Sequence, residues 1–181
     1  MKINIYSYEF PQPIGNIGIA EAGGKIVRVV FGLTVEKLRD VDRLQEYFSK
    51  PSYKGFALAA RATECTDRAA AQFAEYLDGR RAVFELPLAY EGYRFASKIY
   101  GELLKIPAGE VRSYRDIAES CGAPTAFRVV GMANRNNPIP FFIPCHRVIG
   151  SNGSLTGYTG GLEMKRYLLD LEKKHYAGAA V

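Results

Sequence analysis

A cysteine directly before a histidine is the part of this sequence best suited to chemistry. Cys145 and His146 lie between two apolar runs, so they could sit in a built pocket. A thiol attacks as its thiolate, and a nearby imidazole or a water relay can take the proton at neutral pH. The pair therefore fits a nucleophile with its base. It also fits a buried cysteine that serves as a small apolar residue.

The residues around this pair form a longer motif. Asn137 and Pro138 come first, apolar residues 139–143 follow, and the run Pro144-Cys145-His146-Arg147-Val148 completes it. This spaced pattern resembles the active-site signature of the O6-alkylguanine-DNA alkyltransferases (methylated-DNA–protein-cysteine methyltransferases), the suicide DNA-repair proteins. Further similarity covers much of the rest of the chain, at residues 71–88, 93–114 and 157–172, whereas the first third matches loosely, at residues 13–15.

The resemblance implies a methylated-DNA–protein-cysteine S-methyltransferase that acts on O6-alkylguanine in DNA, and on O4-alkylthymine. Cys145 would attack the alkyl carbon in a single displacement. The alkylated oxygen faces into the base stack, so the nucleotide must first flip out, at a cost of a few kcal/mol. The product is a thioether, which offers water no activated carbonyl. Each molecule would therefore act once.

The resemblance also implies catalytic roles for residues outside the Cys-His pair. His146 would take the thiol proton through a water, and Glu172 would orient His146 and favour its cationic form. Asn137 would tie the neighbouring helix to the active-site loop, although it also fits a simple turn residue before Pro138. Tyr114 would supply a proton or hydrogen bond to the leaving guanine. Otherwise it is a surface residue of a capped helix.

The implied substrate pocket is built mainly from one loop. Tyr158 would wall the base, and the hydroxyl or backbone N–H of Thr159 would meet the guanine oxygen. The backbone carbonyls of Cys145 and Val148 would accept the exocyclic amine, which distinguishes guanine from adenine. Arg147 is expected to anchor the loop by an internal ion pair. Two more residues complete the implied substrate site, Gly160 and Phe95.

Two short helices must position the residues that contact DNA. Ser113 and Asp116 have the spacing of a capping box, and Gly122 ends the helix that they begin. Pro124-Thr125 start a second helix, which runs to about Arg135. Two short helices joined by a tight glycine-containing turn form a helix-turn-helix pattern. An ordinary helical hairpin in a core fits the same pattern.

The second of these helices separates apolar from basic residues. The predicted apolar stripe consists of Ala126, Val129, Val130 and Ala133, and the opposite side carries Arg128, Gly131 and Arg135. A helix-turn-helix usually reads the major groove. The resemblance instead implies that this helix enters the minor groove and that Arg128 fills the space left by the flipped base. Phe127 is bulkier than the residue that the family usually has before that arginine. The implied DNA contacts are Tyr114, Thr125, Ala126, Arg128, Gly131 and Arg135.

The remaining pattern predicts an α+β fold. Residues 1–6 alternate like a strand, and strands at 14–20 and 25–31 flank the hairpin signal Gly23-Gly24. Helices are expected at 34–48 and 65–77, and Gly79 is expected to end the second of them. An extended linker should follow at 85–92. After it, helical spacing is seen at Phe95, Ile99, Leu103 and Leu104.

These elements suggest two domains. We expect a small N-terminal antiparallel β-sheet with helices over residues 1–90, and a mainly helical, helix-turn-helix domain over 91–181. The resemblance implies that the first is ribonuclease-H-like and the second winged-helix-like.

Composition limits the function class. The chain has 181 residues, no apolar run near the ~20 needed to cross a membrane and no signal-peptide pattern at its start, so a cytoplasmic location is expected by default. We also expect a monomer. Cys65, Cys121 and Cys145 show no metal-ligand spacing, and the only histidines are His146 and His175. We therefore expect no metal and no cofactor.

Charge is unevenly distributed and favours a polyanionic partner. Residues 1–91 carry 12 basic and 12 acidic side chains, whereas residues 92–181 carry 12 and 7. The whole net charge of +5 therefore lies in the second half. A basic half is the electrostatic footprint expected for a polyanionic partner, and the resemblance implies that this partner is double-stranded DNA.

Two other functional classes remain open from the sequence. A non-catalytic lesion-recognition protein would use Arg128 and the base pocket without alkyl transfer, and the presence of Cys145 argues against it. A Cys-His hydrolase would need turnover and an oxyanion hole.

Overall fold

The computed structural model describes residues 2–49, 53, 55–90 and 94–176. Its contacts divide the chain into two compact units. The first comprises Met1–Glu75 and Phe84–Glu91, and the second Tyr76–Val83 and Gly92–Val181. Residues 76–83, which the sequence analysis placed in the first domain, thus pack with the second unit.

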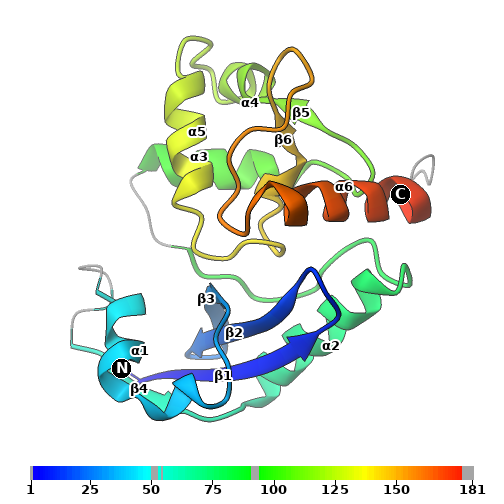
Figure 1. Ribbon diagram of the computed structural model, residues 1–181. Coiled ribbons are helices and arrows are strands. Elements are labelled where there is room, and N and C mark those ends of the chain that lie inside the picture. The colour runs from blue at the N-terminus through cyan, green and yellow to red at the C-terminus, as the bar shows by residue number, and fades with distance from the viewer. Residues whose placement is uncertain (1, 50–52, 54, 91–93, 177–181) are drawn as a thin grey trace. The chain divides into compact units, whose positions relative to one another are not determined.

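The first unit is built on a four-stranded sheet (Figure 1). Strands β1 (Lys2–Phe10), β2 (Gly15–Ala22) and β3 (Lys25–Phe31) form an antiparallel meander, and β4 (Ala57–Ala60) pairs with β1 in parallel. The sheet is therefore mixed, and the expectation of a purely antiparallel sheet is wrong. Residues 32–56 between β3 and β4 are long enough for the crossover that a parallel pair requires.

The hairpin predicted at Gly23-Gly24 is confirmed. Both glycines have positive φ, 60° and 76°, as a two-residue turn of type I′ needs, and Ala22 pairs with Lys25 across it. The predicted extended segment 85–92 also pairs with this hairpin as far as it is described, because Ile26 exchanges backbone hydrogen bonds with Pro87 and Ala89 at 2.8 Å each.

The helix predicted over 34–48 is wrong in its extent. The chain forms a short 3₁₀ turn, η1 (Lys37–Arg39), and then α1 (Val41–Tyr47). Asp40 interrupts them with extended backbone, φ −91° and ψ 92°, and its carbonyl accepts the first hydrogen bond of α1, from Leu44 N. Aspartate favours such a position because its side chain competes for backbone hydrogen bonds.

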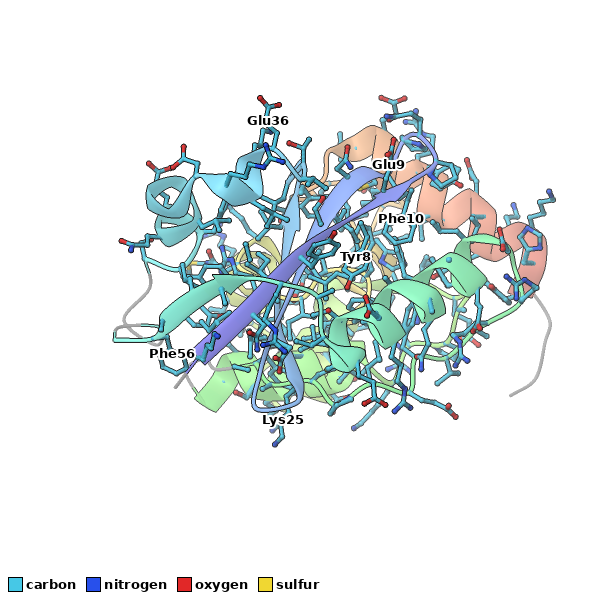
Figure 2. The ribbon with its side chains drawn as sticks, turned by 90° about the horizontal axis from the view of Figure 1, so that it is seen from below. Tyr8, Glu9, Phe10, Lys25, Glu36 and Phe56 are labelled. Carbon is cyan, nitrogen blue, oxygen red and sulfur yellow. The ribbon has the colours of Figure 1, made fainter. Side chains whose placement is uncertain are left out.

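The sheet has a helix on each face. Ile3 and Ile5 of β1 belong to a buried cluster that includes Leu44 and Phe48 from the α1 region. Alternate residues face the other way, towards α2 (Glu64–Leu77), the helix that the sequence predicted at 65–77. Figure 2 shows Tyr8 and Phe10 on that face of β1; Phe10 meets Phe73 of α2 edge to face at 5.0 Å.

The second unit is mainly helical. Helices α3 (Arg94–Leu103), α4 (Tyr114–Ser120) and α5 (Phe127–Arg135) pack against one another, and α6 (Leu162–Tyr176) follows later in the chain (Figure 1). A 3₁₀ turn, η3 (Cys145–Arg147), leads into β6 (Val148–Ile149), which pairs in parallel with β5 (Arg112–Ser113). This pairing fixes the start of α4 beside the end of the Cys-His turn.

The capping box that begins α4 is confirmed. Asp116 N donates to Ser113 Oγ at 3.1 Å, and Ser113 N donates back to the Asp116 carboxylate at 2.8 Å. Gly122, with φ 69°, follows the end of this helix. The second helix, α5, begins at Phe127 rather than at Pro124-Thr125, because Ala126 N bonds to Ala123 O in a preceding turn.

The predicted apolar stripe of α5 needs one correction. Val130, Ala133 and Asn134 are the buried residues, whereas Val129 is 41% exposed. Residues 130, 133 and 134 share one face of a 3.6-residue helix, and residue 129 is turned about 100° away from residue 130. The exposed side of α5 is thus more apolar than expected.

No helix within the described ranges combines the length and apolarity needed to cross a bilayer.

Candidate active site

Cys145 lies in a closed turn that Asn137 holds. The cysteine is 4% exposed, and Asn137 Nδ2 donates to its Sγ at 3.1 Å and to Ile143 O at 2.8 Å. The Asn137 oxygen accepts from Ile139 N at 3.0 Å. Asn137 comes two residues after the end of α5, so it fastens that helix to the active-site loop.

The Cys145 thiol is protonated in this environment. Burial raises the pKa of Cys145 to about 11, although the hydrogen bond from Asn137 and the positive charge of Lys165 both lower it. A thiol of this kind needs a base before it can attack.

His146 is the side chain that the sequence analysis expected to be that base. It is 1% exposed, and its Nε2 lies 3.0 Å from Glu172 Oε1. The carboxylate can only accept, so Nε2 carries the hydrogen and Nδ1 keeps its lone pair. Within the described part of the chain, this buried Nδ1 has no hydrogen-bond partner.

Glu172 favours the cationic form of His146, as the sequence analysis expected, but burial and nearby positive charges outweigh it. Burial, together with the charges of Arg147 and Lys165, lowers the pKa of His146 by more than Glu172 raises it, and the net pKa falls below its usual value. The imidazole is therefore neutral at neutral pH, the state in which it can accept a proton.

Arg147 forms the internal ion pair that was predicted. Its Nε lies 3.0 Å from both Glu172 oxygens, its Nη2 lies 2.8 Å from Oε1, and its Nη1 donates to Ile106 O at 2.5 Å. Burial of Glu172 opposes its ionisation. The hydrogen bond from His146 and the charge of Arg147 outweigh burial and hold the pKa of Glu172 far below its usual range.

Two residues that the sequence analysis missed, Tyr76 and Lys165, also influence Glu172 and Cys145. Tyr76 donates its hydroxyl to Glu172 Oε1 at 2.7 Å. Lys165 is fully buried and donates to Val148 O at 2.6 Å and Thr156 O at 3.0 Å. Burial lowers the pKa of Lys165 to about 8, although nearby Cys145 raises it.

A sequence signal for Lys165 existed. Residues 164, 165, 168, 171 and 172 share one helical face of α6, and all are buried. A lysine and a glutamate within such a stripe indicate paired, functional charges, because isolated buried charges are costly. Tyr76 had no comparable signal, because it is a tyrosine on the apolar face of a helix far away in the sequence.

A pocket of about 730 Å³ opens beside this cluster. Its wall includes five residues implied by the sequence, namely Tyr114, Gly131, Arg135, Tyr158 and Thr159. Tyr158 links the pocket to the Cys-His turn, since its ring meets the His146 ring edge-on with centroids 6.3 Å apart. Several implied residues are not part of this wall, namely Phe95, Thr125, Ala126, Arg128, Cys145, Val148 and Gly160.

Tyr114 and α5 meet at one side of the pocket. The Tyr114 hydroxyl accepts a hydrogen bond from Thr156 Oγ1 at 3.0 Å. Its ring lies 3.9 Å from where a Cβ on Gly131 would be. Thr159 Oγ1 donates weakly to Arg135 O at 3.4 Å.

The exposed surface of α5 is basic and apolar at once. The Arg128 guanidinium lies over the Phe127 ring, 5.9 Å from its centroid, which is a cation–π arrangement. Phe127 is 40% and Met132 59% exposed. Large apolar side chains seldom face water together with arginines unless the surface binds something.

A search of the described residues finds no group of three or more His, Cys, Asp or Glu side chains that could hold a metal ion.

Several known proteins with similar sequences are described as methylated-DNA–protein-cysteine methyltransferases. Residues 94–174 match the family model "6-O-methylguanine DNA methyltransferase, DNA binding domain". The constitutive methylated-DNA–protein-cysteine methyltransferase of Bacillus subtilis (strain 168) is 41% identical over 165 residues, covering 91% of this chain and 93% of that protein. The enzyme of the same description from Methanosarcina barkeri (strain Fusaro / DSM 804) is 50% identical over 107 residues, which cover 59% of this chain and 68% of that protein.

Solved structures extend the similarity to nearly the whole chain. The crystal structure of Mycobacterium tuberculosis OGT in complex with DNA matches with a TM-score of 0.77 and 34% sequence identity. The match covers 97% of this chain and 96% of the chain in that structure. The chain therefore belongs to the methylated-DNA–protein-cysteine methyltransferase family, enzymes that repair DNA by alkyl transfer.

Proposed function

We propose that Cys145 is the alkyl acceptor and that O6-alkylguanine in double-stranded DNA is the donor, with O4-alkylthymine as a second donor. The observation that carries this proposal is a buried thiol next to a neutral imidazole with an open lone pair, in a turn beside a pocket. In the proposed reaction, Sγ forms a bond to the alkyl carbon, the carbon–oxygen bond breaks, and guanine leaves. The alkylated thioether ends the activity.

The proposed proton path has two separate ends. His146 Nδ1 takes the thiol proton through a water, while Glu172 holds Nε2. The Tyr114 hydroxyl, which accepts from Thr156, keeps its own proton for the leaving guanine. Lys165 supports the thiolate by its charge.

The pocket is suited to a flipped nucleobase. A volume of about 730 Å³ falls within the range of small-ligand pockets. Tyr158 and Thr159 line it, and Phe95 and Gly160, which lie outside this wall, remain part of the proposed substrate site. Val148 O already accepts from Lys165, but a carbonyl has two lone pairs and can still accept the exocyclic amine of guanine.

We propose that α5 enters the minor groove and that Arg128 replaces the flipped base. Two observations support this proposal. Phe127, Arg128 and Met132 lie on the exposed face of α5, and the second half of the chain carries the net positive charge. Minor-groove proteins commonly use arginines with apolar wedges of this kind. The remaining DNA contacts of this proposal are Tyr114, Thr125, Ala126, Gly131 and Arg135.

We also propose that the protein acts as a monomer, without metal or cofactor, and that its first unit is ribonuclease-H-like and its second unit winged-helix-like. Dialysis against a chelator should leave the transfer rate unchanged. A loss of activity that zinc restores would contradict this proposal.

Mass spectrometry after exposure to methylated duplex DNA tests the central proposal. Tryptic mapping should place one added CH₂ on the peptide that holds Cys145. The Cys145→Ser variant should gain no mass and still bind DNA. A label on Cys65 or Cys121 would show a wrong acceptor, and binding without any label would favour a non-catalytic lesion-recognition protein.

Two substrates separate base flipping from thiol activation. Arg128→Ala should slow repair of duplex DNA strongly and hardly change the reaction with free O6-benzylguanine, which needs no flipping. His146→Ala or Glu172→Gln should slow both reactions. An equal loss on both substrates in Arg128→Ala would show that Arg128 is structural.

A further inference from the structure

Tyr76 is a buried phenol next to the proposed base but outside the segment 94–174 that matches the family model. It lies in the last turn of α2 and is 1% exposed. Its hydroxyl donates to Glu172 Oε1 at 2.7 Å, which is shorter than the 3.0 Å between that oxygen and His146 Nε2.

Glu172 Oε1 is shared among several donors. His146, Tyr76 and Arg147 all reach this oxygen, whereas Oε2 receives Gly109 N at 3.1 Å and Arg147 Nε. An oxygen's lone-pair density is limited, so each further donor weakens the bond to the others. Tyr76 and His146 therefore compete for one acceptor.

The Tyr76 phenol is held firmly in this position. Its ring stacks on Tyr176 with centroids 6.2 Å apart and an angle of 19° between planes. The Tyr176 hydroxyl donates to Tyr76 O at 3.0 Å and to Arg81 O at 2.8 Å. Burial and the negative charge of Glu172 raise the pKa of Tyr76 well above its usual value, so the hydroxyl remains a donor throughout the working pH range.

We propose that Tyr76 is a positioning residue for thiol activation, which shares the Glu172 carboxylate with His146 and so limits how strongly that carboxylate stabilises the imidazolium. The inference rests on the proposed function, in which His146 is the base. Without the hydroxyl, more negative charge would face Nε2. His146 would then hold a proton up to a higher pH and would lose its capacity as a base over a wider acid range.

The Tyr76→Phe change leaves the chemical identity of the other charged and titratable groups around His146 unchanged. Arg147 and Lys165 disfavour the imidazolium, and Glu172 favours it. Among the described residues, Cys145 and Tyr158 are two further titratable neighbours, the first adjacent in the chain and the second at the ring edge. A Tyr76→Phe change therefore isolates one hydrogen bond.

The test is the pH dependence of benzyl transfer from free O6-benzylguanine to Cys145, measured from about pH 5 to 9. In Tyr76→Phe the midpoint of the acid limb should move to higher pH by roughly half a unit to one unit, the size expected for one hydrogen bond. Tyr176→Phe is the matched control, because its hydroxyl belongs to the same cluster but contacts only backbone carbonyls. Its midpoint should equal that of the wild type.

A ring-fluorinated tyrosine at position 76 gives a second measurement that keeps the ring and the hydroxyl. The more acidic phenol is a stronger donor, so the midpoint should move to lower pH. An unchanged midpoint in both position-76 variants, or an equal shift in Tyr176→Phe, would overturn the role of Tyr76. A wild-type protein that does not transfer benzyl to Cys145 would instead overturn the proposed function itself.

Discussion

At the scale of single residues, the site is a protonated thiol kept next to a neutral base. Burial raises the pKa of Cys145 to about 11 and lowers that of His146. Both shifts favour uncharged partners in the resting state. In the proposed mechanism, charge separation would wait until a substrate is in place, which would limit side reactions of the thiol.

This resting state predicts the pH dependence of Cys145 alkylation by iodoacetamide. A raised thiol pKa means that the thiolate fraction is small and grows about tenfold per pH unit below pH 11. The initial rate at Cys145, followed by peptide mapping, should therefore still be rising at pH 9. A plateau near pH 8.5, where an ordinary thiol titrates, would contradict the raised pKa.

The Arg147–Glu172 pair predicts a large effect on stability. Arg147→Ala would leave a buried carboxylate without its cation. We expect it to lower the free energy of unfolding by about 3–5 kcal/mol, the typical cost of breaking a buried ion pair. Urea unfolding at pH 7 measures it. Arg147→Lys should recover only part of the loss, because lysine lacks the planar fork. The exposed Arg115→Ala is the control.

The same pair fixes the direction of the pH effect on folding. The pKa of Glu172 is lower in the folded than in the unfolded chain, so its contribution is fully present above about pH 4.3, the unfolded value. It is lost as the pH falls through the folded-state pKa. The difference between wild type and Arg147→Ala should shrink in that acid range.

At the scale of elements, α5 combines a buried face that fixes it with an exposed face that offers a surface. Val130 and Ala133 hold the helix in the unit, and Asn137 ties its end to the Cys-His turn. Gly131 lies between Arg128 and Arg135 without a side chain. The helix backbone is therefore open to close approach by a ligand at this point.

Gly131→Ala should stabilise the protein and weaken DNA binding. The new Cβ would meet only Tyr114, at 3.9 Å, and alanine exceeds glycine in helix propensity by up to about 1 kcal/mol. In the proposed complex the methyl group would hold the backbone off the groove, and duplex affinity should fall about tenfold, roughly 1.4 kcal/mol. Thermal unfolding and fluorescence anisotropy with duplex DNA measure the two effects.

Gly101→Ala in α3 is the matched control. A Cβ at Gly101 would meet nothing within 4 Å, so it should stabilise the protein in the same way and leave DNA affinity unchanged. Equal DNA affinities for the two variants would remove α5 from the proposed interface.

Part of this architecture was predictable from local sequence, because the signals were local. Gly23-Gly24 needed no distant partner to specify its turn, and neither did the Ser113–Asp116 capping box. Long-range features were not predictable in this way. The parallel pairing of β4 depends on a crossover, and Tyr76 reaches Glu172 across 96 positions. The net charge state of His146 depends on burial, which a motif does not record.

At the scale of the whole molecule, positive charge is concentrated in the second half of the sequence. Residues 92–181 carry 12 basic and 7 acidic side chains, while residues 1–91 are balanced. The second half of the chain therefore attracts a polyanion, whereas the first half has no net charge to attract one.

The salt dependence of duplex binding tests this distribution. Each phosphate contact that is lost should reduce the slope of log affinity against log salt by about one. If Arg128 or Arg135 neutralises a phosphate, its alanine variant should show that reduction. Arg61→Ala in the balanced first half is the control and should keep the wild-type slope. Equal slopes for all variants would place the phosphate contacts elsewhere.

Met132 on α5 is more accessible to oxidants than Cys145. Met132 is 59% exposed, whereas Cys145 is 4% exposed and carries a protonated sulfur. Peroxide should therefore convert Met132 to its sulfoxide before it oxidises Cys145. A protein oxidised in this way should lose affinity for duplex DNA, still react with free O6-benzylguanine, and recover its DNA affinity when a sulfoxide reductase restores the thioether.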